Sequence, residues 1–98
     1  MTTGDERQAA AARIAELLDL FKRQQGPDIP SILEEGEALS RAVNAFHMEG
    51  IRFRIYNLDR LMTRNAASLP AEARTLLEET RRHLEAAGFH TRSHQSPV

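Results

Sequence analysis

The stretch between Pro30 and Pro70 contains no proline, and this constrains the fold more than any other feature of the chain. Proline is the strongest helix breaker, and within this stretch apolar residues recur at the spacing of a helix face. Ser31, followed by a glutamate three residues later, has the pattern of a capping box at a helix N-terminus. The sequence therefore predicts one long helix over residues 31–64, and it leaves open whether that helix breaks at Gly50.

A second helix is predicted before the long one, over residues 5–25. Its apolar residues follow the i, i+3, i+4, i+7 pattern of an amphipathic helix: Ile14, Leu17, Leu18 and Phe21. The pair Gly26-Pro27 ends this pattern, because proline cannot continue a helix and glycine favours a helix end. We expect this helix to present one apolar face to the core.

A third helix is predicted over residues 70–87, since proline suits the first helical position. Gly88 can adopt the left-handed conformation that ends a helix, after which Phe89 folds back. The remaining residues, 90–98, are polar and show no period, so we expect a flexible C-terminal tail. These patterns predict a single helical domain over residues 1–89, followed by the tail.

The predicted central helix is too long and too broadly apolar for the rest of the chain to cover. At 1.5 Å per residue it would span about 50 Å, whereas a compact domain of this size has a radius of gyration of about 13 Å. The apolar residues of its two halves point about 100° apart on a helical wheel, an arc too wide for one neighbouring helix. The sequence thus predicts an all-α, three-helix chain with a long central helix that assembles as a helical-bundle homodimer. The residues expected in the dimer interface are Leu39, Val43, Phe46, Phe53, Ile55, Leu58, Leu61 and Met62.

Composition narrows the classes of partner. Thirteen basic and fourteen acidic residues give a formal net charge of −1, so we expect neither nucleic acid nor a membrane as a partner. The chain has no cysteine, which excludes disulfides and thiolate metal sites. It also lacks a signal-peptide pattern and an apolar run of membrane-spanning length, so a cytoplasmic location is expected.

His47, Gly50 and Arg54 are the candidate ligand-binding residues. His47 and Arg54 lie seven residues apart and project near the middle of the apolar arc, with Gly50 between them. In one interpretation Arg54 holds a carboxylate or phosphate in a small pocket and His47 acts as a donor or proton carrier. In the other, Arg54 pairs with a glutamate across the bundle and fixes the register between subunits.

Residues 45–50, with the sequence AFHMEG, resemble the motif of histidine phosphotransfer domains, in which a glycine closely follows the phosphorylated histidine. The family pattern has a lysine and then the glycine at the fourth position after the histidine. Here Gly50 is at the third position and Glu49 replaces the basic residue. The resemblance implies a phosphoryl-accepting role for His47 only.

The sequence shows no other pattern of catalysis. It has no glycine-rich phosphate loop and no serine-centred nucleophile elbow, and it lacks the Glu-x-x-His spacing of di-iron bundles. We therefore expect no enzyme activity, no metal and no cofactor. The predicted function is a non-enzymatic interaction or regulatory protein that acts as a homodimer and binds a protein partner or a small anionic ligand. The alternative is a histidine-phosphotransfer-like or ligand-sensing bundle that uses His47 and Arg54.

Overall fold

The computed structural model describes residues 3–89 and 91, and within them every regular element is a helix. The elements are α1 (Thr3–Lys22), α2 (Ile29–Asn44), α3 (Met48–Arg64), the short 3₁₀ helix η1 (Ala66–Ser68) and α4 (Ala71–Ala86). The all-α prediction is confirmed. The prediction of three helices is wrong, because the described part of the chain contains four α-helices. None of the helices in that part is both long enough and apolar enough to span a membrane.

The predicted long central helix is two helices, α2 and α3, separated by a turn around Phe46. The φ angle of Phe46 is 56°, which is the left-handed conformation found just after many helix ends. The Phe46 N–H donates to the carbonyl of Val43 (3.2 Å), and the His47 N–H donates to that of Ala42 (3.0 Å). These two bonds form a Schellman motif, which normally has glycine at the left-handed position. The helix therefore ends before Gly50 and not at it.

The end of α4 also forms a Schellman motif, and here a glycine occupies the left-handed position. Gly88 has a φ angle of 99°, and its N–H donates to the carbonyl of Glu85, while the Phe89 N–H donates to that of Leu84 (2.9 Å). Phe89 folds back and is buried, as predicted. Thr91 is also buried, and its hydroxyl donates to the Glu85 carboxylate (2.7 Å). The rest of the predicted flexible tail lies outside the described residues.

The start of α2 differs from the prediction. The helix begins at Ile29, with Pro30 in its first turn, where the fixed φ of proline is favourable. Ser31 therefore lies inside the helix and the expected capping box does not form. The carboxylate of Asp28, just before the helix, instead accepts a hydrogen bond from the side-chain amide of Asn65 (2.9 Å). This bond ties the start of α2 to the end of α3.

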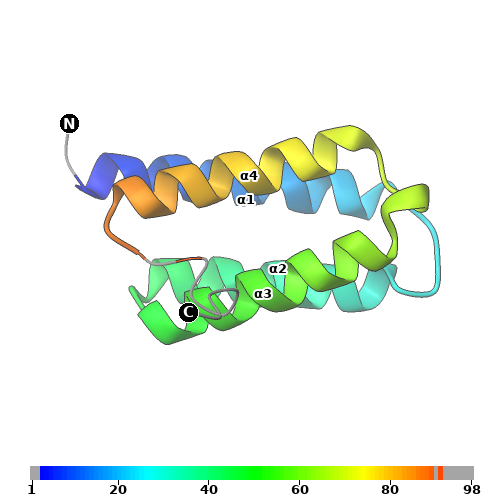
Figure 1. Cartoon of the computed structure of the whole chain (residues 1–98), viewed down its shortest axis with the longest axis horizontal. Helices are drawn as coiled ribbons and strands as arrows, with labels where there is room; N and C mark the ends of the chain where they lie inside the picture. The colour runs from blue at the N-terminus through cyan, green and yellow to red at the C-terminus, as the bar shows by residue number, and fades with distance from the viewer. Residues whose placement is uncertain (1–2, 90, 92–98) are drawn as a thin grey trace, which may run out of the picture.

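The four helices form a bundle of two layers, with α1 beside α4 in one layer and α2 beside α3 in the other (Figure 1). A third extensive contact joins α1 and α2 across the layers. The edge between α3 and α4 is the most open of the four edges of the bundle, because these two backbones approach each other least. Long side chains therefore have to close this edge.

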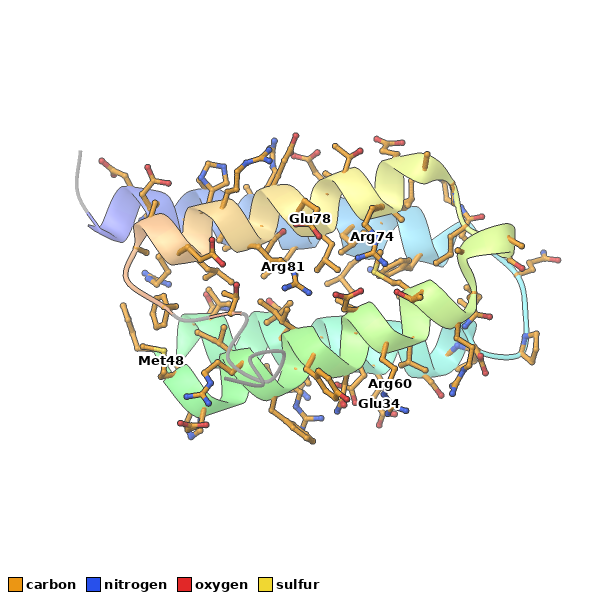
Figure 2. All side chains as sticks on the ribbon, viewed as in Figure 1. Glu34, Met48, Arg60, Arg74, Glu78 and Arg81 are labelled. Atoms are coloured by element: carbon orange, nitrogen blue, oxygen red, sulfur yellow. The ribbon has the colours of Figure 1, made fainter. Side chains whose placement is uncertain are left out.

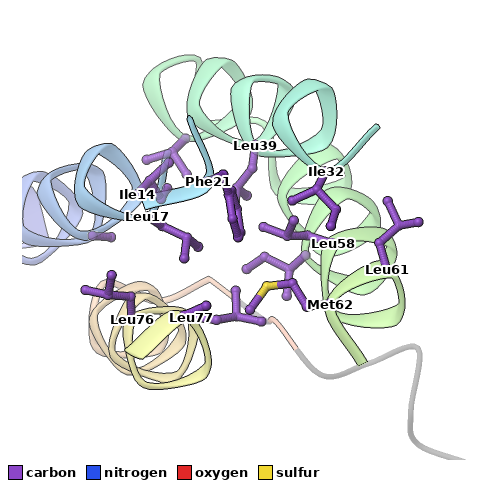
Figure 3. Close-up of a cluster of buried hydrophobic side chains, with 14 of the residues drawn as sticks. Ile14, Leu17, Phe21, Ile32, Leu39, Leu58, Leu61, Met62, Leu76 and Leu77 are labelled. Carbon is purple, nitrogen blue, oxygen red and sulfur yellow. The ribbon is translucent and has the colours of Figure 1, made fainter. Parts of the chain in front are cut away.

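The core lies between the two layers, and all four helices contribute to it (Figure 3). The predicted apolar face of α1 is confirmed, since Ile14, Leu17 and Phe21 are fully buried. Because α2 and α3 are separate helices, each turns its own apolar face towards α1 and α4, which accounts for the offset between the two halves on the helical wheel. The over-wide face that suggested assembly therefore does not exist in the folded chain.

Candidate functional site

His47 is the N-cap of α3 and its side chain is exposed. Its Nδ1 atom accepts a hydrogen bond from the backbone N–H of Gly50 (2.8 Å), which satisfies one of the free N–H groups at the start of the helix. A neutral imidazole that accepts at Nδ1 carries its proton on Nε2. In this tautomer the ring has no free lone pair at Nε2 with which to accept a phosphoryl group.

Gly50 allows a close approach between α2 and α3. A Cβ atom at this position would lie 2.7 Å from the Nδ1 atom of His47 and 3.3 Å from the Cβ atom of Ala42. Glycine thus leaves space for the histidine cap and for the neighbouring helix, and that space is already filled. The structure brings His47 and Gly50 together as the cap of a helix.

Arg54 does not join His47 and Gly50 in a pocket. Its guanidinium group lies 3.2 Å from the carboxylate of Glu35 on α2 and 5.2 Å from the centre of the Phe53 ring. The glutamate partner that one interpretation expected is therefore Glu35 of the same chain. The Arg54 side chain is 37% exposed, so this ion pair mainly orients α2 against α3 and adds little stability.

Six of the eight residues predicted for a dimer interface lie in the core of the single chain, where α1 and α4 cover them: Leu39, Val43, Ile55, Leu58, Leu61 and Met62. The other two, Phe46 and Phe53, are exposed to 60% and 47%. Phe46 lies in the turn before α3 with the Arg7 guanidinium 4.3 Å from the centre of its ring. Phe53 lies on α3 itself, so it is the predicted interface residue that remains available on a helix surface.

A cluster of charged residues closes the open edge between α3 and α4. Asp59 on α3 accepts hydrogen bonds from Arg81, from Arg74 (2.8 Å) and from the hydroxyl of Thr63 (3.2 Å). Arg74 also donates to the Thr63 hydroxyl (3.0 Å), and Glu78 lies 3.8 Å from both arginines. Figure 2 shows Arg74 and Arg81 extending from α4 towards α3. The cluster links two helices whose backbones hardly touch.

Arg81 is fully buried, whereas the side chain of Asp59 is 20% exposed. Burying a guanidinium group is costly unless a carboxylate and further hydrogen bonds compensate for the lost water. Asp59 provides the carboxylate, which one guanidinium nitrogen of Arg81 reaches, and it can do so only when α4 has the correct register along α3. The cluster thus fixes the position of α4 in the bundle.

None of Asp59, Arg74 and Arg81 was predicted as a site residue, although the sequence contains a signal for one of them. Arg81 lies four residues after Leu77 and three before Leu84, which are both on the apolar face of α4. A charged residue at such a position is a candidate for burial with a partner. No sequence signal identifies Asp59 as that partner, because 22 positions separate the two residues.

A shallow surface hollow of about 350 Å³ lies beside the cluster and is lined by residues of α3: Tyr56, Asp59, Arg60, Thr63 and Arg64. Asp59 is already satisfied by its two arginines, and the guanidinium group of Arg64 lies 3.6 Å from Asp28. Arg60 is exposed and forms no ion pair with any residue in the described ranges. Arg60 is therefore the cation that this surface offers to an anionic group.

The outward surface of the α2–α3 layer, here called the hairpin face, carries both aromatic and charged residues. It comprises Glu34, Glu37 and Arg41 on α2 and Phe53, Tyr56 and Arg60 on α3, all of them exposed. Each set has the i, i+3, i+7 spacing that places side chains on one side of a helix. In the view of Figure 2, Glu34 and Arg60 lie at a similar position along this layer, both directed away from α1 and α4.

The described residues contain no group of three or more histidine, aspartate or glutamate side chains that could hold a metal ion. Another hollow, of about 220 Å³, lies where α3, η1 and α4 meet. Its lining is mostly apolar and consists of Met62, Ala66, Leu69, Pro70, Ala71, Ala73 and Arg74.

Comparison of the chain with protein-family models, curated proteins and solved structures gives no match in any of the three.

Proposed function

We propose that this chain is a non-enzymatic interaction protein that acts as a homodimer and that binds its partner through the hairpin face. The observation that carries the proposal is the exposure of Phe53 and Tyr56 on the same side of α3 as Arg60. Aromatic residues and arginine are the residue types most enriched at protein interfaces and among their energetic hot spots. A protein partner or a small ligand would place an anionic group at Arg60.

The alternative, a phosphotransfer or ligand-sensing bundle, has less support. The exposure of His47 would allow a phosphoryl donor to reach it. However, its Nδ1 atom accepts the Gly50 N–H, so a free lone pair at Nε2 would require the other tautomer, in which Nδ1 carries the proton and this cap bond is lost. Arg54 could not assist without leaving Glu35. The hairpin face requires no such rearrangement.

Sedimentation velocity across micromolar concentrations tests the proposal. We expect the wild-type sedimentation coefficient to rise with concentration, as in a reversible dimer, and Phe53→Ser to remain a monomer. Phe46→Ser is the matched control, because it removes a phenylalanine outside the hairpin face that is even more exposed than Phe53, and it should dimerise like the wild type. A wild-type protein that remains monomeric throughout would refute the homodimer.

A further inference from the structure

We infer that the partner of the hairpin face is a second copy of this chain, with Glu34 of each copy opposite Arg60 of the other and Arg41 opposite Phe53. This inference rests on the proposed function and specifies which surface of the partner is used. Two observations carry it: the distribution of charge on the hairpin face and the register between α2 and α3.

The hairpin face carries charges of both signs that are not used within the described part of the chain. Glu34, Glu37, Arg41 and Arg60 form no ion pair with any residue there. A uniformly acidic partner would be repelled by the two glutamates, and a uniformly basic partner by the two arginines. A surface that carries both members of each pair is instead complementary to itself, as the interface of a two-fold dimer must be.

The register of the hairpin determines which of these residues lie at the same height. Asp28 is bonded to Asn65 at one end of the hairpin, and Gly50 lies against Ala42 at the other. Because the helices are antiparallel, each step along α2 corresponds to one step back along α3. Counting from either contact places Glu34 within two residues of the height of Arg60, an offset of at most about 3 Å at the helical rise. The same count places Arg41 within two residues of Phe53.

If the two copies are related by a two-fold axis parallel to the helices, residues at equal height on α2 and α3 come into contact between the copies. Rotation about such an axis lays α2 of one copy over α3 of the other without changing the height of any residue. Glu34 then meets Arg60 of the second copy, and Arg41 meets the ring of Phe53. The chain already makes this second kind of contact, since Arg7 lies over Phe46 and Arg54 near Phe53. Symmetry forms each contact twice in the dimer.

Charge reversal followed by mixing tests this arrangement. Arg60→Glu alone places two glutamates opposite each other at both symmetry-related positions, and Glu34→Arg alone places two arginines there. We expect each variant to dimerise at least about tenfold more weakly than the wild type, because like charges in contact are strongly unfavourable. When the two variants are mixed, every opposed pair has opposite charge, so heterodimers should form with nearly wild-type affinity.

The matched control is Arg82→Glu, which reverses an exposed charge on α4 away from the hairpin face, and it should leave the dimerisation constant unchanged. Circular dichroism of each variant shows whether it is folded, and the mixing result itself requires two folded chains. A wild-type dimer that neither reversal weakens, or two weakened variants that do not recover on mixing, would overturn this arrangement and leave the homodimer itself intact. A monomeric wild type would refute the proposed function and this inference together.

Discussion

Arg81 has the largest fully buried side chain in the described part of the chain, and Asp59 makes its burial possible. A buried ion pair contributes little net stability compared with apolar residues of the same size, but removing one partner leaves an uncompensated charge in the core. Packings of α4 that bury Arg81 away from Asp59 are therefore strongly unfavourable.

Asp59→Ala should destabilise the protein by about 3 kcal/mol, since Arg81 would then remain buried without its principal carboxylate. The free energy of unfolding from urea denaturation measures this effect. Asp19→Ala removes an exposed aspartate from α1 and should change that free energy by less than about 0.5 kcal/mol. A loss below about 1 kcal/mol for Asp59→Ala would mean that Asp59 does not support the buried charge.

For single residues, the sequence predicts the burial of apolar side chains better than the partners of polar ones. Ile14, Leu17 and Phe21 are buried as their spacing requires, because burial of apolar residues follows directly from helix periodicity. The sequence leaves the role of Arg54 open, since its partner Glu35 lies 19 positions away and no local rule identifies it. Contacts between distant positions depend on the packing of the helices, which one-dimensional patterns do not specify.

The turn at Phe46 is the element that converts one predicted helix into a hairpin. Helix ends marked by proline or glycine were predicted to within a few residues, as at Gly26-Pro27 and Gly88. The end of α2 has neither residue and depends on a phenylalanine in the left-handed conformation. Such a conformation is unfavourable for a residue with a side chain, so nothing local in the sequence indicated it. Tertiary packing of α2 and α3 against α1 and α4 provides the compensating energy.

Phe46→Gly should make the protein more stable than Phe46→Ala by about 1 kcal/mol, because only alanine retains the unfavourable left-handed backbone. Both substitutions remove the ring over which Arg7 lies, so the comparison isolates the backbone term. Thermal and urea unfolding of the two variants provide the measurement. At the neighbouring Ala45, where φ is −90°, glycine should instead lower stability. Equal stability of the two Phe46 variants would show that the turn is not strained.

At the scale of the whole molecule, the bundle has a closed core and two surfaces of different character. The edge between α3 and α4 is held by Asp59, Arg74 and Arg81, whose charges are largely used within the chain. The hairpin face carries charges that the described residues do not neutralise, together with the exposed ring of Phe53. The sequence predicts a homodimer from one long central helix, but that helix is divided into α2 and α3. The proposed homodimer is therefore based on the hairpin face.

Amide chemical shifts recorded by NMR during dilution of the wild-type protein test the central claim most directly, because they report where the copies touch. We predict that the amides of Glu34, Arg41, Phe53 and Arg60 shift together as the dimer dissociates, while those of Glu72 and Arg82 on α4 remain in place. Spectra that do not change across micromolar to millimolar concentrations, or shifts confined to the α1–α4 layer, would contradict the assignment of the hairpin face as the interface.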